Sequence, residues 1–231
     1  MSNHVIELHK IQKYYTVGKE NQLVIKGVDL TIQKGETIAL LGKSGSGKST
    51  MLNILGLLDF PTDGIYKLNG KEIAGYNDND RAVIRNKTFG FIFQQFNLLP
   101  KLSVIDNVTA PLYYSTDKSK WTNRHKIGME LLEKFDIADQ ANKLPKLLSG
   151  GQQQRVAMAR SLVNDPDIII GDEPTGALDS KTTDQVMDEI FRLNTEFGKT
   201  VIFVTHDDDL ASRFGRIIRL KDGLIVDNFE H

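Results

Sequence analysis

Two short segments of the sequence carry residue types suited to phosphate chemistry. The first runs Gly-Lys-Ser-Gly-Ser-Gly-Lys-Ser over positions 42–49 and fits the pattern G-x-x-x-x-G-K-[ST]. Glycines let the backbone wrap closely around phosphates, so that successive N–H groups point inward. Lys48 would place a positive charge on the β- and γ-phosphates, and Ser49 offers a hydroxyl ligand to Mg²⁺. The residues expected to contact nucleotide are Gly42, Ser44, Gly45, Gly47, Lys48, Ser49 and Thr50.

The second segment is an apolar strand pattern at 168–171 that ends in two carboxylates, Asp172 and Glu173. Adjacent strand residues point to opposite sides, so one carboxylate can face a metal while the other reaches a different part of the site. We expect Asp172 to join the Mg²⁺ shell through water and Glu173 to polarise an attacking water as general base. An Asp-Glu pair alone more often caps a strand. The phosphate loop upstream and the turn at 174–176 favour catalysis.

These segments need elements that hold them in place. The apolar run at 37–41 lies between turn signals and predicts a buried parallel strand that leads into the phosphate loop, and a helix pattern follows through 51–58. Asn69-Gly70 is a hairpin-turn signal. Further strands are expected at Val5–Leu8, Val24–Ile32, Tyr66–Leu68, Ile168–Ile170, Val201–Val204, Ile217–Leu220 and Leu224–Val226, with helices within 95–165 and near 181–196 and 208–213. Strands that alternate with helices predict an α/β fold with a parallel sheet, interrupted by a helical insertion.

Composition excludes several classes of protein. The 231 residues are 40% hydrophobic and 26% charged, an ordinary globular balance. The net charge of -1 gives no electrostatic case for a nucleic-acid partner, and we expect none. The absence of cysteine rules out disulfides and thiolate chemistry. No apolar run approaches the ~18 residues of a spanning helix, and the N-terminus lacks a secretory signal, so any membrane part should belong to another chain.

The segment Leu148-Ser-Gly-Gly-Gln152 makes a family resemblance specific. The chain resembles the nucleotide-binding subunit of an ATP-binding cassette (ABC) transporter, in which LSGGQ is the signature. The motif order is similar too, with the phosphate loop, a glutamine loop at Gln94, the signature, the acidic pair, a D-loop at 177–179 and a switch histidine at His206. The motifs stretch from about 15 to 206 and cover nearly the whole chain.

The resemblance implies a single ABC ATPase domain over 1–231, with ATP and Mg²⁺ as ligands. Its core would be a P-loop NTPase (RecA-like) fold with a mostly parallel sheet and an N-terminal antiparallel β subdomain, formed by about 1–93 and 166–231. A helical subdomain with the signature would occupy about 95–165. By the same resemblance Gln94 approaches Mg²⁺ and the lytic water, and His206 contacts the γ-phosphate. Tyr15 sits where the family stacks adenine. The neighbouring Tyr14 is the alternative ring, and the spacing to 25–27 favours Tyr15.

The residue types of the signature also indicate anion binding, without reference to the family. Ser149, Gly150 and Gly151 allow close approach to an anion, and the helix expected from Gln152 directs a positive N-terminus at it. Ser-Gly-Gly on its own is more often a plain turn into a helix. If the family architecture holds, two chains stack head to tail as an ATP-dependent homodimer, and each signature faces ATP on the partner's phosphate loop.

The resemblance is closest to a bacterial branch that holds macrolide-exporter and lipoprotein-releasing ATPases. It implies a separate membrane permease as partner, hydrolysis of ATP through an intact catalytic set, and a cytoplasmic location on the inner face of the membrane. We expect the permease to contact the helical middle, around Phe96, Leu98, Leu99, Pro100, Leu102, Val104 and Trp121. The main alternative is a non-transport ABC ATPase of a membrane complex, in cell division or mechanical signal relay. Its divisome member typically reads LSGGE where this chain has Gln152. DNA-repair or translation ATPases and P-loop kinases fit less well in length and motifs.

Overall fold

The computed structural model describes residues 3–18, 20–173 and 180–230. The chain divides into two compact units, which are described separately. Unit 1 comprises residues 1–81 and 193–231, and unit 2 comprises residues 82–192. The expected turn at 174–176 and the D-loop at 177–179 lie outside the described residues.

Unit 1 holds most of the strands. Its elements in chain order are β1 (His4–Val17), β2 (Glu20–Gln33), β3 (Thr37–Leu41), α1 (Lys48–Leu55), β4 (Asp63–Leu68), β5 (Lys71–Glu72), β8 (Thr200–Thr205), α8 (Asp208–Ala211), β9 (Arg216–Lys221) and β10 (Leu224–Glu230). Two helices cross the unit boundary along the chain, α2 (Asp78–Thr88) and α7 (Ser180–Thr195).

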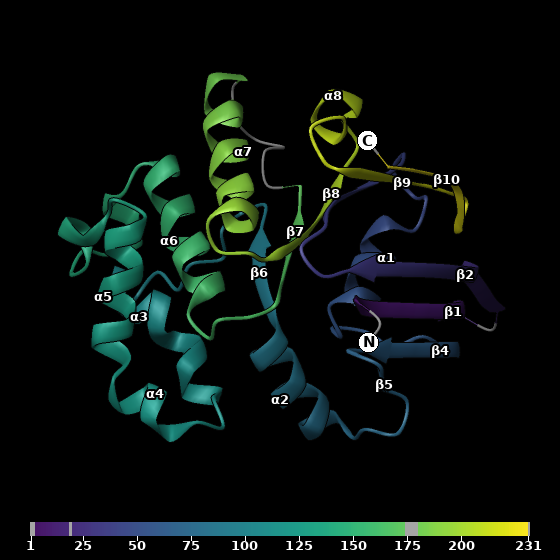
Figure 1. Ribbon diagram of the computed structural model, residues 1–231, viewed down its shortest axis with the longest axis horizontal. Coiled ribbons are helices and arrows are strands. Elements are labelled where there is room, and N and C mark those ends of the chain that lie inside the picture. Colours follow the sequence, from purple (N-terminus) through teal and green to yellow (C-terminus); the bar gives the residue numbers. More distant parts are fainter. Residues whose placement is uncertain (1–2, 19, 174–179, 231) are drawn as a thin grey trace. The chain divides into compact units, whose positions relative to one another are not determined.

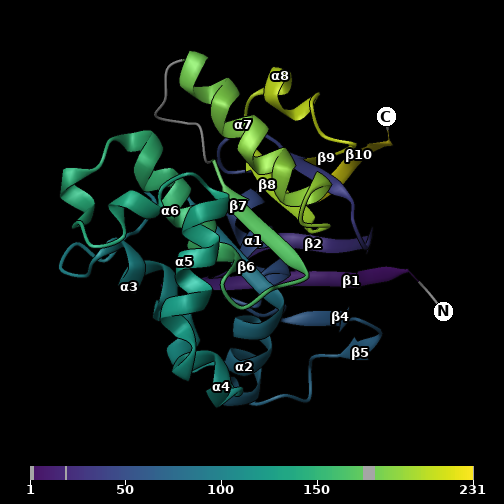
Figure 2. The same cartoon turned by 60° about the vertical axis from the view of Figure 1, so that its left-hand side comes forward.

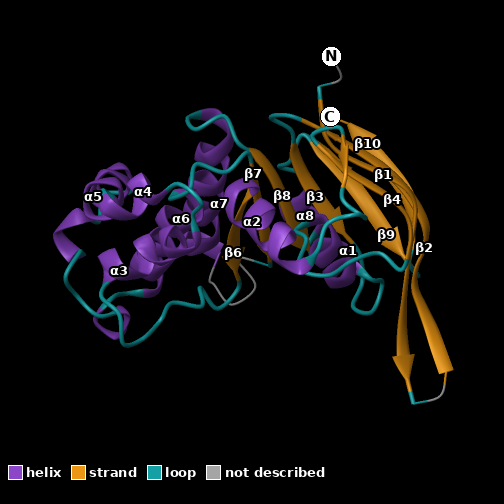
Figure 3. Ribbon diagram, turned by 90° about the horizontal axis from the view of Figure 1, so that it is seen from below, coloured by secondary structure: helices purple, strands orange, loops and turns teal. Residues whose placement is uncertain are grey.

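The first sheet of unit 1 is antiparallel, with the strand order β2-β1-β4-β5 (Figure 1). Its β4–β5 turn contains Asn69 at φ 49° and Gly70 at φ 74°, so the predicted Asn-Gly hairpin is confirmed. β1 is much longer than the expected strand, because it pairs with β2 along its whole length and with β4 over part of it. Beyond β4, β1 and β2 continue as a two-stranded ribbon (Figure 3).

The second group of strands in unit 1 has the order β10-β9-β3-β8. β3 is parallel to both β8 and β9, and β10 returns antiparallel to β9. The predicted buried strand at 37–41 is confirmed, and its residues 38–41 are buried. α1 packs on β2 and β8. The core of this unit includes the fully buried side chains Ile6, Leu8, Ile11, Ile25, Ile32, Ile38, Leu40, Met51, Ile54 and Leu55.

Unit 2 is mainly helical. Its elements are β6 (Phe89–Phe93), α3 (Val104–Thr109), the 3₁₀ turn η1 (Ala110–Tyr114), α4 (Lys118–Thr122), α5 (Arg124–Lys134), the 3₁₀ turns η2 (Ala138–Gln140) and η3 (Pro145–Leu147), α6 (Gly150–Leu162) and β7 (Ile168–Asp172). α3, α5 and α6 pack on one another, as Figure 2 shows, and α6 packs on β6. β6 and β7 are parallel neighbours. Helices lie within the 95–165 segment, where the sequence pattern predicts them.

Candidate nucleotide-binding site

The phosphate loop of residues 42–49 connects the buried end of β3 to the first turn of α1. Two of its glycines take left-handed backbone angles, Gly45 at φ 80° and Gly47 at φ 101°, which other residues adopt only with strain. A Cβ atom on Gly47 would lie 3.0 Å from Ile25 Cδ1, whereas one on Gly45 would meet no described atom within 4 Å. The loop is therefore pressed against the fold at Gly47 and open at Gly45.

Lys48 is held by the loop that precedes it. Its Nζ donates hydrogen bonds to the carbonyl oxygens of Gly42 at 2.7 Å and Lys43 at 3.0 Å, and only 7% of the residue is exposed. Ser46 Oγ is buried, and among the described residues it has no hydrogen-bond partner. Ser49, which directly follows Lys48, is exposed. A buried ammonium, an unsatisfied hydroxyl and an exposed serine at a helix N-terminus form a cradle suited to an anion and a hard cation.

The hairpin formed by β9 and β10 contacts the phosphate loop. In the turn between β9 and β10, the N–H of Gly223 donates to the carbonyl oxygen of Ser46 at 3.0 Å. The carbonyl oxygen of Gly223 accepts from the N–H of Lys26 at 2.9 Å. At the start of the loop, a Cβ on Gly42 would lie 2.4 Å from the carbonyl oxygen of Leu220. The β9–β10 hairpin therefore touches the phosphate loop at two places, at Ser46 through Gly223 and at Gly42 through Leu220.

His206 lies at the same sheet edge as the phosphate loop. In the parallel register of β3 and β8, Leu41 is opposite Thr205, so Gly42 and His206 both follow the carboxyl ends of neighbouring strands. His206 is exposed, and α8 begins directly after it, capped by the Asp207 carboxylate. Ligands bind at this edge in open α/β sheets. The structure thus brings the switch-histidine candidate to the edge that carries the phosphate loop.

In unit 2, parallel strand register brings Gln94 close to the acidic pair Asp172 and Glu173. β6 and β7 are parallel, with Phe93 opposite Asp172, so Gln94 and Glu173 both leave the carboxyl ends of adjacent strands. Glu173 has φ 40°, a left-handed conformation that costs a non-glycine residue about 1–3 kcal/mol and is often found at functional sites. An exposed amide and two half-buried carboxylates therefore share one edge of the strand pair.

The glutamine loop is tied to the signature helix by a residue that the sequence analysis missed. Arg160, near the end of α6, donates to the carbonyl oxygens of Phe96 at 2.5 Å and Asn97 at 2.7 Å. These two residues have φ 55° and 46°, so the chain turns sharply just after Gln94. Burial lowers the pKa of the Arg160 guanidinium from its ordinary value. Arg160 therefore connects the loop that follows Gln94 to the helix that begins at the signature.

The signature begins α6. Ser149 is the N-cap, and a capping box is formed in which its hydroxyl accepts from the N–H of Gln152 at 3.3 Å while Gln152 Oε1 accepts from the N–H of Ser149 at 3.0 Å. The helix starts at Gly150, two residues before the expected start at Gln152, because the serine already supplies the cap. A Cβ on Gly150 or Gly151 would meet no described atom within 4 Å. The helix N-terminus therefore presents two uncovered glycines.

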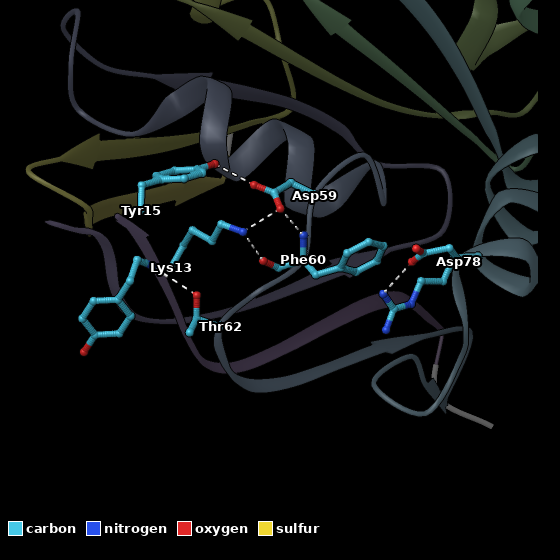
Figure 4. A network of polar contacts seen from close by, with 8 residues as sticks. Lys13, Tyr15, Asp59, Phe60, Thr62 and Asp78 are labelled. Atoms are coloured by element: carbon cyan, nitrogen blue, oxygen red, sulfur yellow. Dashed lines mark hydrogen bonds and ion pairs between the residues drawn. The ribbon is translucent and has the colours of Figure 1, made fainter. Parts of the chain in front are cut away.

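The adenine-stacking candidate Tyr15 lies on β1 in unit 1. Its hydroxyl donates to Asp59 Oδ2 at 2.6 Å, so the ring is anchored beyond the end of α1 (Figure 4). Tyr14 is equally exposed, but its hydroxyl donates to Gln12, within its own strand. The last turn of α1 is fixed as well, since the buried Tyr66 hydroxyl donates to the carbonyl oxygen of Leu55 at 2.7 Å, and burial raises the pKa of that phenol. Of the two rings, only Tyr15 is anchored next to the phosphate-loop helix.

The expected permease-contact residues divide between surface and core. Leu99, Leu102 and Trp121 are exposed, whereas Val104 is fully buried. The buried Asn107 amide shapes this segment by accepting from the N–H of Leu99 and donating to three carbonyl oxygens, including that of Leu102. The prediction that Val104 contributes to the permease contact is therefore wrong, because its side chain belongs to the core of unit 2.

The candidate site residues thus form two groups. The phosphate loop, His206 and Tyr15 belong to unit 1, and Gln94, Asp172, Glu173 and the signature belong to unit 2. Asp59, Arg160 and Gly223 were not predicted from the sequence, since each acts through a partner far away along the chain. Only Gly223 had a local signal, an Asp-Gly pair between two strand patterns.

Two general features of the described residues bear on function. In the described ranges, no helix is long and apolar enough to cross a membrane. No group of three or more His, Asp or Glu side chains within those ranges forms a ready metal site. Mg²⁺ commonly binds through one or two protein oxygens together with substrate phosphates, so hydroxyl and carboxylate donors suit it.

Comparisons with known proteins point to one family. The profile of the family described as ABC transporter matches residues 25–176. The ABC transporter ATP-binding protein YknY of Bacillus subtilis is 46% identical over 222 residues, covering 96% of this chain and 95% of the relative. The macrolide export ATP-binding/permease protein MacB of Bdellovibrio bacteriovorus is 45% identical over 221 residues, covering 96% of this chain but 33% of the relative. The chain therefore spans about a third of the length of that relative.

Solved structures agree with the sequence relatives. The chain aligns with a TM-score of 0.84 and 43% identity to the ATP-binding cassette MJ0796, described as a dimer in a post-hydrolysis state bound to ADP and Pi. This alignment covers 97% of the chain and 98% of that structure. The expected P-loop NTPase fold, with an antiparallel N-terminal sheet and a second sheet flanked by helices, is confirmed.

Proposed function

Since this chain belongs to the ABC transporter family and is an ATP-binding domain of it, we propose that it hydrolyses ATP to drive a separate membrane permease. The observation that carries the proposal is the phosphate loop, with a buried Lys48, left-handed glycines and an open face at Gly45. These features suit a bound triphosphate better than any purely structural role, because a structural loop has no need to bury a lysine.

ATP and Mg²⁺ are the proposed ligands of this loop. The backbone of 42–47 and Lys48 would hold the phosphates, Thr50 would flank them, and Tyr15 would stack on adenine. The oxygens of Ser49, Gln94 and Asp172 would hold Mg²⁺, in part through water. When bound, this cation offsets the negative charge that builds on the β- and γ-phosphates.

Hydrolysis needs a base and positive groups around the γ-phosphate. Glu173 orients and deprotonates the attacking water, aided by the Gln94 amide. Lys48 and His206 stabilise the charge that spreads over the γ-phosphate oxygens in the transition state. The two strand edges described above support this assignment, because Gln94 lies beside the acidic pair and His206 lies beside the phosphate loop.

The working form is proposed to be a homodimer. Ser149, Gly150, Gly151 and Gln152 of one protomer would face ATP held by the phosphate loop of the other. The uncovered glycines at the N-terminus of α6 support this, since an anion can approach the N–H groups there. A similar cassette is described as a dimer.

The membrane partner is proposed to be a permease that exports or extracts drugs, peptides or lipoproteins. The name of the MacB relatives, macrolide export ATP-binding/permease protein, supports export, and about two thirds of the length of the Bdellovibrio relative lies outside the match. The exposed Leu99, Leu102 and Trp121 would contribute to the contact. The chain would then sit on the cytoplasmic face of the membrane, without a nucleic-acid partner.

The catalytic assignment is tested by Glu173→Gln, with the exposed Glu130→Gln on α5 as control. The variant should bind ATP and dimerise with it, while phosphate release falls by about 10²–10⁴-fold, the range for general-base catalysis. Lys48→Ala should weaken ATP binding itself. Wild-type turnover in Glu173→Gln would refute the base assignment. Isolation of the native chain from membranes without any integral membrane protein would refute the permease proposal.

A further inference from the structure

Asp59 joins two side chains of β1 with both of its carboxylate oxygens (Figure 4). Lys13 Nζ donates to Asp59 Oδ1 at 2.6 Å, and the Tyr15 hydroxyl donates to Asp59 Oδ2 at 2.6 Å. Lys13 also donates to the carbonyl oxygen of Phe60 at 2.8 Å. Asp59 lies shortly after α1, so these bonds connect the strand that carries Tyr15 to the segment that leaves the phosphate-loop helix.

The same contacts fix the Tyr15 ring itself. Lys13 Nζ lies over the Tyr15 ring, 5.0 Å from its centre, and makes a cation–π contact with it. Tyr15 as a residue remains 37% exposed, so it is accessible to a ligand. Burial and the bond to Asp59 raise the pKa of the Tyr15 phenol, whereas the side chain of Thr50 lowers it.

The carboxylate is stabilised as an anion in this setting. Partial burial by itself would raise the pKa of Asp59. The hydrogen bonds from Lys13, from Tyr15 and from the N–H of Phe60 outweigh burial and hold that pKa below its ordinary value. The Asp59 side chain is 28% exposed and that of Lys13 is 12% exposed, so this ion pair is better shielded than most surface pairs.

We propose that Asp59 is a positioning residue for the adenine site. By holding the Tyr15 hydroxyl and the Lys13 ammonium, it sets the plane of the ring on which the base stacks and links that ring to the phosphate-loop helix. An aromatic ring held in one orientation loses less entropy on binding a base than a free one does. This inference rests on the proposed ATP binding, and it selects Tyr15 over Tyr14, whose hydroxyl lies outside the network.

The test compares ATP with inorganic tripolyphosphate, which has the phosphates but no base. Dissociation constants are measured by calorimetry on the full chain for wild type, Asp59→Ala, Tyr15→Phe and the double variant. Asp59→Ala and Tyr15→Phe should each weaken ATP binding by about 3- to 10-fold, the effect of about one net hydrogen bond. Tripolyphosphate binding should not change. The double variant should bind ATP no more weakly than Asp59→Ala, because both changes break one linkage.

Matched controls separate positioning from structure. Tyr14→Phe removes a neighbouring hydroxyl outside the network, and Asp78→Asn removes a paired carboxylate elsewhere in unit 1. Both should bind ATP as wild type does. If Asp59→Ala fails to fold, Tyr15→Phe and Lys13→Met carry the same comparison, since each removes one arm of the network.

The outcomes distinguish this inference from the proposed function. Equal weakening of ATP and tripolyphosphate in Asp59→Ala, or unchanged ATP binding, would overturn the positioning role. So would additive effects in the double variant. If wild type binds neither ATP nor tripolyphosphate, or if Lys48→Ala binds both as wild type does, the proposed function itself fails and the inference fails with it.

Discussion

Replacing Gly223 with alanine should damage the phosphate loop from a distance of more than a hundred residues along the chain. Gly223 has φ 80°, and a Cβ atom there would lie 2.1 Å from the carbonyl oxygen of Val24. That oxygen belongs to the backbone of β2, so a side-chain rotation cannot relieve the clash. The turn must move away, and its hydrogen bonds to Ser46 and Lys26 are then weakened or lost.

The size of the effect follows from these contacts. A left-handed backbone costs an alanine about 1 kcal/mol relative to glycine. Each of the two hydrogen bonds contributes about 1 kcal/mol net. The total for Gly223→Ala is about 3 kcal/mol. Gly70→Ala is a matched control, since Gly70 also lies in a hairpin turn, at φ 74°, but a Cβ there meets no described atom within 4 Å. It should cost only the conformational term of about 1 kcal/mol.

Urea unfolding of both variants measures the difference. Gly223→Ala should shift the midpoint to lower urea than Gly70→Ala, with an unchanged slope and a difference of about 2 kcal/mol in the free energy of unfolding. Calorimetry should show weaker ATP binding only in Gly223→Ala, because the carbonyl of Ser46 loses its support. If the two variants are equally stable and bind ATP equally well, the support of the loop by the β9–β10 turn is refuted.

Three further predictions follow from single contacts. Arg160→Met removes the hydrogen bonds to the carbonyl oxygens of Phe96 and Asn97, so ATP hydrolysis should fall at least tenfold while ATP binding persists. Lys126 is an exposed cation on α5, and Lys126→Met is the control. A matching loss of hydrolysis in Lys126→Met would contradict the role of Arg160. Ser149→Asp retains an N-cap and should keep the thermal midpoint, whereas Ser149→Ala should lose about 1 kcal/mol of folding stability. ATPase activity should nevertheless fall in Ser149→Asp, because the new charge repels phosphate. Full activity in Ser149→Asp would contradict the signature assignment. Because the pKa of Asp59 is lowered in the folded state, its ionised carboxylate stabilises the fold fully above the ordinary carboxyl value of 3.8, and this stabilisation is lost as the pH falls through the folded-state value. Acid unfolding of Asp59→Asn should therefore be less pH-dependent below 3.8 than that of the wild type. An unchanged acid transition would contradict the pairing.

Elements with a strong local pattern were predictable from the sequence. The apolar run that became β3, the glycine loop and the start of α1 each follow from neighbouring residues, as does the Asn69-Gly70 hairpin. α2 was not predicted, because it is polar and has no apolar stripe. Asp78 and Asp80 lie in its first turn and Arg85 and Lys87 in its last, which suits the helix dipole. The full length of β1 was also missed, because its pairing partners lie elsewhere in the chain.

The candidate site shows the same division. Residue type and spacing predicted the phosphate loop, because a phosphate-binding loop requires glycine and lysine in a set order. The acidic pair was assigned with the help of that upstream loop, and the signature was assigned from the family resemblance. The spacing could not choose firmly between Tyr14 and Tyr15. That choice depends on which hydroxyl reaches Asp59, a residue 44 positions away from Tyr15.

The sequence by itself therefore determined the kind of chemistry, since a local motif carries its own donors and backbone freedom. The tertiary structure decided which distant residues support that chemistry. Strand register puts His206 beside the phosphate loop and Gln94 beside Glu173, and a hairpin turn at Gly223 supports Ser46. Register and hairpin contacts arise from hydrogen bonds between strands far apart in the chain, and such pairings leave no trace in local spacing.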